Sequence, residues 1–129
     1  YTKKMLAYLA THIEMLAGHN EFTALTVMPA LPPRARAALS KEMVDGFYTE
    51  GATKVLDPVA KFMARHAVKL KTVHKTGPAG ETIARYAEAG GYDLIMMGSH
   101  GQGALANLVM GSVTTNVLAQ CSVPLLIVR

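Results

Sequence analysis

The chain has 129 residues, of which 50% are hydrophobic and 17% are charged. A chain of this length suits one domain, and its hydrophobic fraction excludes a disordered chain that is solvated by its charges. The formal net charge is +4, but twelve of the thirteen lysines and arginines precede Asp93 and are mixed with acidic residues. We therefore expect a solvated surface of mixed charge and no nucleic-acid partner.

The remaining composition excludes several other classes of protein. No apolar run approaches the length that spans a bilayer, and residues 1–5 lack the apolar stretch of a signal peptide. The single cysteine, Cys121, cannot form an internal disulfide, and the five histidines show no spacing typical of metal ligands. We expect a cytoplasmic protein with no membrane contact and no metal site of its own.

The first part of the chain predicts a helix followed by a strand. In residues 1–18, apolar side chains recur every three or four positions, which is the spacing of one helical face. Residues 22–28 have the composition of a strand, which Pro29 ends. We expect the prolines and arginines of residues 29–36 to form a loop.

A long helix is predicted after Ser40, because a serine hydroxyl is a good N-cap. Its expected core face consists of Val44, Phe47, Val55, Val59 and Phe62. Pro58 is expected to kink this helix or to begin its second half. Residues 68–74 then alternate as in a strand, and Lys69 and Lys71 on one face indicate an edge strand.

The rest of the chain repeats this alternation twice. A helix is expected between Pro78 and the glycine pair 90–91, followed by a nearly continuous apolar run at residues 92–97 that predicts a buried strand. Residues 112–121 predict a helix and residues 123–128 a last strand. Strands that are separated by helices require crossover connections, so we expect one α/β domain over residues 1–129 with a doubly wound parallel sheet.

Regularly spaced glycines follow the strand predicted at residues 92–97. Gly98 stands directly after it, Gly101 follows after two residues, and the pair Gly111-Ser112 opens a helix after nine more. A glycine at the carboxyl end of a strand lets a ribose or phosphate approach the backbone. The free N–H groups at a helix start favour an anion, so two such backbone sites around one loop suit a triphosphate.

This glycine pattern resembles the nucleotide motif of the universal stress protein family, Gly-x2-Gly-x9-Gly-Ser/Thr, and residues 123–128 are similar to the last strand of that family. The resemblance implies a Rossmann-like, adenine nucleotide alpha hydrolase-like sheet in the order 3-2-1-4-5. It also implies that ATP, with or without Mg2+, binds at the carboxyl edge. Carried over by position, the residues implied to bind the nucleotide are Val27, Met97, Gly98, Ser99, His100, Gly101, Gly111, Ser112 and Val113.

One part of the family pattern has no counterpart in this sequence. The first strand of the family ends in an Asp-Gly-Ser-like turn whose aspartate binds the nucleotide, and no such segment occurs here. We therefore expect the first strand to be missing, either because the sequence is N-terminally incomplete or because another chain fills its place. A gap would then separate the strands at residues 22–28 and 92–97.

The function implied by the resemblance is that of an ATP-binding regulatory module of the stress response rather than an enzyme. We expect it to signal as a homodimer through residues 123–128, because an apolar edge strand invites pairing with a second copy. No aspartate or glutamate follows Asp93 to hold Mg2+ or activate water. Two alternatives stay open: a slow ATP hydrolase or phosphotransferase, and a stress dimer that binds no nucleotide.

Overall fold

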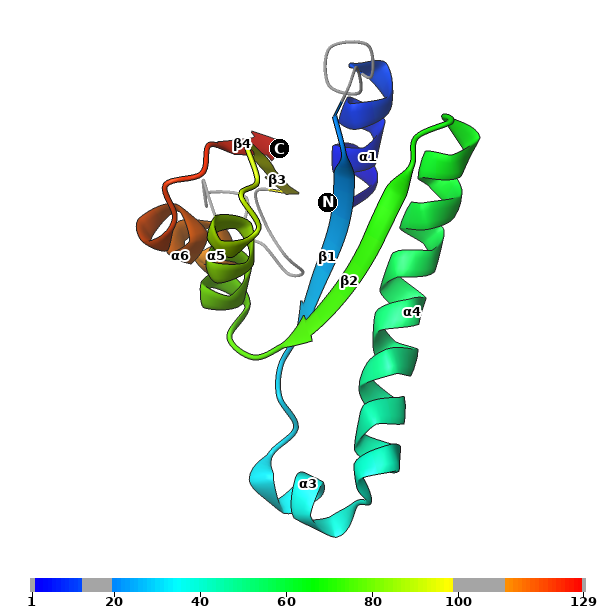
Figure 1. Cartoon of the computed structure of the whole chain (residues 1–129), viewed down its shortest axis with the longest axis vertical. Helices are drawn as coiled ribbons and strands as arrows, with labels where there is room; N and C mark the ends of the chain where they lie inside the picture. Colours follow the sequence, from blue (N-terminus) through cyan, green and yellow to red (C-terminus); the bar gives the residue numbers. More distant parts are fainter. Residues whose placement is uncertain (1, 13–19, 99–110, 129) are drawn as a thin grey trace. The chain divides into compact units, whose positions relative to one another are not determined.

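The computed structural model describes residues 2–12, 20–98 and 111–128. Their helices and strands follow one another as shown in Figure 1. In chain order they are α1 Thr2–Thr11, β1 Phe22–Met28, α3 Pro33–Ala38, α4 Lys41–Arg65, β2 Leu70–Thr76, α5 Ala79–Ala89, β3 Ile95–Gly98, α6 Ser112–Gln120 and β4 Leu125–Val128.

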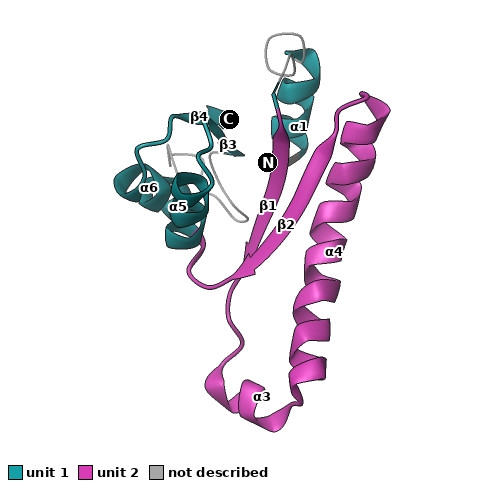
Figure 2. Cartoon of the chain, viewed as in Figure 1, with its two compact units in different colours: residues 1–20, 80–129 teal, residues 21–79 magenta. Residues whose placement is uncertain are grey.

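The chain divides into two units, which Figure 2 distinguishes by colour. The β1–β2 unit comprises residues 21–79, and the β3–β4 unit comprises residues 1–20 and 80–129. Each unit contains one parallel pair of strands, β1 with β2 and β3 with β4. The expected α/β class with parallel strands is therefore confirmed. Among the described strands, β1 and β3 each have one partner.

In the β1–β2 unit, α4 covers one face of the strand pair (Figure 1). The two strands pair from Phe22 with Leu70 to Met28 with Thr76. Met28 points toward α4, because a Cβ atom on Gly51 would lie only 2.5 Å from its terminal methyl group. Successive side chains of a strand alternate between faces, so Val27 lies on the face that α4 does not cover.

Helix α4 begins where the sequence predicts, but its core differs in part from the prediction: Val44, Val59 and Phe62 are half-buried rather than buried. The Ser40 hydroxyl accepts a hydrogen bond from the Met43 N–H at 3.1 Å, as expected of an N-cap. The buried residues of the helix are Ala52, Leu56 and Met63. The predicted core residues Phe47 and Val55 are 51% and 50% exposed, so the predicted face is wrong there.

The cause of this difference is the close packing of α4 on β1. Gly51 and Ala52 are small enough to let the helix approach Met28, and the turns that follow bury Leu56 and Met63. The larger side chain of Phe47 lies outside this contact. Pro58 lies inside a helix that continues from Lys41 to Arg65.

Four further elements differ from the prediction in their boundaries or type. The segment expected as a loop at residues 29–36 instead runs into the short helix α3, Pro33–Ala38, because a proline at the first helical position already has the required φ. Strand β2 begins at Leu70 rather than at residue 68. Strands β3 and β4 are each four residues long, and residues 92–94 and 123–124 precede them as irregular backbone.

In the β3–β4 unit, α1 packs against both strands. Its apolar stripe contributes Leu6 and Leu9, which are buried, as the helical spacing predicts. The predicted positions in residues 13–18 lie outside the described residues. Strand β3 is half-buried along its length, so the expectation of a buried strand is wrong for the described structure.

Candidate functional site

The carboxyl end of β3 and the first turn of α6 are joined by a hydrogen bond within the β3–β4 unit. The hydroxyl of Thr114 donates to the carbonyl oxygen of Gly98 at 3.3 Å, and Thr114 is only 2% exposed. Gly98 is the last residue of β3, and Thr114 is the third residue of α6. The two glycine-containing ends of the motif are therefore brought to one edge of the strand pair.

The start of α6 has the properties of an anion-binding helix end. Gly111 is its N-cap, in an extended conformation with φ −75° and ψ 167°, and it offers no side chain to cap the helix. No acidic residue occupies the first turn. The first N–H groups of a helix lack partners within the helix, and the positive end of its dipole favours an anion. Among the described residues, Gly111 and the exposed Ser112 place neither an acidic side chain nor a capping hydrogen bond at this end, which suits a negatively charged group.

Close packing between α5 and α6 fixes the position of this helix start. A Cβ atom on Gly80 would lie 2.5 Å from the Cβ of Asn116 and 3.3 Å from the carbonyl oxygen of Val113. Val117, one turn further along α6, is 1% exposed. Helix α6 is therefore held by a glycine contact on one side and by the buried residues Thr114 and Val117 on another.

The far end of α6 is held by a carboxylate. One oxygen of Glu88, Oε1, accepts hydrogen bonds of 2.7 Å from both the N–H and the hydroxyl of Ser122. The backbone N–H is the main reason why the pKa of Glu88 lies below its ordinary value, and the hydroxyl of Ser122 and the thiol of Cys121 lower it further. This contact ties the end of α5 to the turn between α6 and β4.

The turn after α5 also behaves as the sequence predicts. Gly91 has φ +66°, and its N–H donates to the Glu88 carbonyl at 3.3 Å. The N–H of Tyr92 donates to the Ala87 carbonyl at 3.1 Å. These two bonds form a Schellman motif, in which the left-handed position favours glycine. The motif directs the chain out of α5 and toward β3.

The structure brings together five of the nine predicted nucleotide-binding residues in the β3–β4 unit. These are Met97, Gly98, Gly111, Ser112 and Val113. Met97 is half-buried and pairs in register with Ile127 of β4. Ser99, His100 and Gly101 lie outside the described residues.

Val27 belongs to the other unit. It is the next-to-last residue of β1, is half-buried, and pairs in register with Lys75 of β2. Its expected contact with the adenine ring stays a prediction.

Sequence reasoning missed Thr114, which connects the two parts of the motif. A threonine at the third helical position, three residues after the helix-opening glycine, has a hydroxyl that can reach a neighbouring strand end. That spacing was the available signal. A threonine in a helix more often bonds to the preceding turn of its own helix, as Thr115 does to the Gly111 carbonyl at 3.0 Å.

Metal-binding clusters and membrane-spanning helices are both absent from the described residues. Among them, no group of three or more histidine, cysteine, aspartate or glutamate side chains is arranged to hold a metal ion. Over the same part of the chain, no helix combines the length and the apolar character needed to cross a membrane.

Comparison with known proteins supports the likeness that the motif indicated. Residues 3–129 match the model of the Universal stress protein family. The universal stress protein MJ0577 of Methanocaldococcus jannaschii is 36% identical over 81 residues, which cover 63% of this chain and 50% of that protein. The universal stress protein Slr1230 of Synechocystis is 38% identical over 74 residues, 57% of this chain and 26% of that protein. The aligned stretches thus span half or less of these two relatives.

Solved structures show a similar architecture over nearly the whole chain. The structure of MJ0577, described as a structure-based assignment of the biochemical function of a hypothetical protein, aligns with a TM-score of 0.73 and 27% identity. It covers 95% of this chain and 85% of that one. The universal stress protein UspA from Lactobacillus plantarum aligns with a TM-score of 0.72 and 24% identity, covering 96% and 90%, and supports the fold alone.

Proposed function

Because this chain belongs to the universal stress protein family, we propose that it is a regulatory module that binds an adenine nucleotide, with ATP as the expected form. Some members of the family bind ATP. The proposed phosphate site consists of the carboxyl end of β3 at Gly98 and the start of α6 at residues 111–113. The finding that carries the proposal is the hydrogen bond from Thr114 to the Gly98 carbonyl, which holds these two segments together.

The described residues at this edge fit an anionic phosphate chain. Gly111 places no Cβ and no capping side chain in front of the first N–H groups of α6. Ser112 is exposed and can donate its hydroxyl hydrogen to a phosphate oxygen. The absence of an acidic residue from the first turn leaves the positive end of the helix dipole uncompensated. These groups bind and orient an anion without providing a base.

We propose that ATP turnover is slow or absent. No aspartate or glutamate follows Asp93 in the sequence, so this segment offers no carboxylate to hold Mg2+ or activate water. It also offers no lysine to neutralise the γ-phosphate. Bound nucleotide would therefore act as a signal in the cytoplasm rather than as a substrate that is consumed.

We also propose that the chain forms a homodimer through the outer edge of β4. Among the described strands, β4 pairs only with β3, and its residues Leu125–Val128 are all apolar. An apolar strand edge favours pairing with a second copy around a two-fold axis. Light scattering on the protein and on Leu126→Lys tests this: a dimer that becomes monomeric supports it, and a monomeric unmodified protein contradicts it.

The experiment that tests nucleotide binding is native mass spectrometry of the purified protein, with and without added ATP. We expect each chain to gain the mass of one ATP, and ADP or AMP to be retained less well because they make fewer phosphate contacts. If inorganic triphosphate is retained as well as ATP, the affinity comes from the phosphates alone, which would contradict recognition of adenine. Absence of any nucleotide-bound species at saturating ATP would contradict the proposal.

A further inference from the structure

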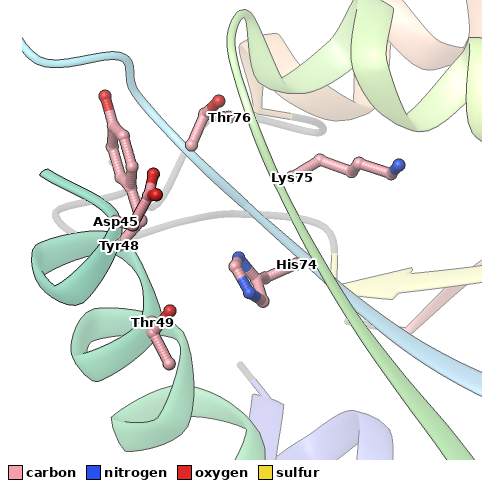
Figure 3. A pocket seen from close by; sticks show the side chains of 6 residues that line it. All are labelled: Asp45, Tyr48, Thr49, His74, Lys75 and Thr76. Atoms are coloured by element: carbon pink, nitrogen blue, oxygen red, sulfur yellow. The ribbon is translucent and has the colours of Figure 1, made fainter. Parts of the chain in front are cut away.

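A polar cavity lies within the β1–β2 unit, between the first turns of α4 and the carboxyl end of β2 (Figure 3). Its volume is about 360 Å3, which is at the small end of the range for ligand sites. The residues that line it are Asp45, Tyr48, Thr49, His74, Lys75 and Thr76. None of these side chains is purely apolar. The cavity shares no residue with the proposed phosphate site on α6.

The position of the cavity is one that parallel sheets use for ligands. Thr76 is the last residue of β2, and ligands of open α/β sheets bind beyond the carboxyl ends of their strands. His74 projects from β2 toward α4, whereas Lys75, from the opposite face of the strand, extends away from the helix (Figure 3). The side chains that face each other across the cavity therefore come from two elements that pack directly against each other.

One wall of the cavity is fixed by a hydrogen bond. The hydroxyl oxygen of Tyr48 accepts from the N–H of Leu31 at 2.7 Å. The hydrogen of that hydroxyl is not used in this bond, so Tyr48 can donate it to another group. The bond holds the half-buried tyrosine ring upright beside Asp45 at the start of α4. Part of the cavity is thus preformed.

The cavity offers both hydrogen-bond donors and hydrogen-bond acceptors. The carboxylate of Asp45 only accepts, the hydroxyls of Thr49 and Thr76 both donate and accept, and the two ring nitrogens of His74 add further hydrogen-bonding groups. A ligand that satisfies this set must itself carry several groups that both donate and accept. Vicinal hydroxyls have this property, whereas an aliphatic or aromatic hydrocarbon does not.

Charge restricts the ligand further. The carboxylate of Asp45 opposes a multiply charged anion, and the ammonium group of Lys75, which also lines the cavity, opposes a cation. Residues 21–79 contain nine lysines and arginines against five aspartates and glutamates, so the unit has a surplus of four positive charges that opposes a polycation. We propose that this cavity binds a small neutral polyol or monosaccharide, with Asp45 and His74 hydrogen-bonded to its hydroxyl groups.

The proposal is tested by recording amide and imidazole NMR signals of the complete chain during titration with D-ribose. Saturable shifts are expected at Tyr48, Thr49, His74 and Thr76, with a dissociation constant in the millimolar range because most of these residues are exposed. Asp45→Asn is expected to weaken binding about tenfold, the loss of one hydrogen bond to a charged acceptor. Asp57→Asn, at an exposed position of α4 outside the cavity, is the matched control and should leave the affinity unchanged.

The imidazole is tested in the same way. His74→Gln should retain part of the affinity, because an amide still donates and accepts, whereas His74→Ala should lose more. His66→Gln controls for removal of an exposed histidine elsewhere in the unit. Shifts that rise linearly without saturation, or an Asp45→Asn variant with unchanged affinity, would overturn the proposal. Tighter binding of inorganic phosphate or putrescine than of ribose would overturn the assignment to a neutral ligand.

Discussion

Thr114 reaches from the first turn of α6 to the last residue of β3, where its hydroxyl donates to the carbonyl oxygen of Gly98 at 3.3 Å. The threonine is 2% exposed, so water does not replace this donor if it is lost. The two backbone segments of the proposed phosphate site are therefore held together by a buried side chain that is not itself among the residues proposed to bind the nucleotide. Thr114 therefore positions the proposed site, and other residues are proposed to bind its ligand.

Thr114→Val tests this role. Valine keeps the shape of threonine but removes the donor, so the variant should lose about 1 kcal/mol of unfolding free energy. It should also bind ATP several-fold more weakly, because Gly98 is no longer held against α6. Thr115→Val is the matched control: its hydroxyl bonds to the Gly111 carbonyl at an exposed position, and the loss should stay below about 0.5 kcal/mol. Denaturant titration and calorimetry measure both quantities, and equal effects of the two changes would contradict the role of Thr114.

The contact between α5 and α6 leads to a second prediction. In Gly80→Ala, the new methyl group would meet the Cβ of Asn116 at 2.5 Å, an atom that cannot swing away, so the helices must separate. We expect a loss of about 1–3 kcal/mol in unfolding free energy. Gly46→Ala provides the contrast, since no atom lies within 4 Å of its new methyl group and it stands in the exposed part of α4. That variant should gain about 0.5–1 kcal/mol, because alanine favours a helix. A stabilising Gly80→Ala would show that the helices are packed less closely.

How much of this structure could be predicted from the sequence depends on the range of the interactions involved. Local signals worked well: the cap at Ser40, the left-handed Gly91 and the helix start at Gly111 all depend on neighbouring residues. The prediction of the core face of α4 was wrong at Phe47, which was chosen for its hydrophobicity. Burial instead follows the small residues that let the helix approach Met28.

In the candidate site, too, features that depend on neighbouring residues could be predicted and those that depend on distant residues could not. Gly98 and Gly111 could be found from their spacing. The spacing of Thr114 after Gly111 indicates only that its hydroxyl can reach a strand end; that the strand end is Gly98, sixteen positions away, depends on the packing of α6. The short helix α3 was hidden by its prolines, which indicate a loop in sequence but also suit a first helical turn. The charged and hydrogen-bonding side chains of the polar cavity come from α4 and β2. These two elements lie side by side because β1 and β2 pair in parallel.

A third prediction concerns the end of α4. The N–H groups of Ala67 and Val68 donate to the carbonyls of Ala64 and Met63, both at 3.1 Å, which is the Schellman pattern that Gly91 completes after α5. Here the left-handed position is occupied by Ala67, with φ +57°. Ala67→Gly should stabilise the protein by about 1 kcal/mol, because glycine avoids the left-handed penalty of an L-residue. Gly91→Ala should cost a similar amount, about 1 kcal/mol, at φ +66°. Thermal and denaturant unfolding measure both, and a destabilising Ala67→Gly would contradict the assignment.

A fourth prediction follows from the lowered pKa of Glu88. A carboxyl group whose pKa is lower in the folded than in the unfolded protein stabilises the fold once it is ionised in both states. Its contribution should be complete above the ordinary glutamate pKa of about 4.3 and should disappear as the pH falls through the lower folded value.

Comparison of the unfolding midpoints of the protein and of Glu88→Gln against pH measures this contribution. The unmodified protein should be the more stable one at neutral pH, and the difference should shrink on acidification below about pH 4.3. Glu50→Gln, at an exposed position of α4, controls for the loss of one negative charge. A difference that stays constant with pH would show that Ser122 does not select the ionised form of Glu88.

Calorimetric titration of Gly111→Val with ATP tests most directly our claim that a nucleotide phosphate binds at the start of α6. The backbone of Gly111 has φ −75°, which any L-residue adopts, so the substitution should leave the fold intact by circular dichroism while its side chain covers the first N–H groups. We predict an ATP affinity at least about tenfold below that of the unmodified protein, and an unchanged affinity in Gly46→Val, which changes a glycine of α4 in the other unit. A folded Gly111→Val variant that binds ATP as tightly as the unmodified protein would contradict the claim.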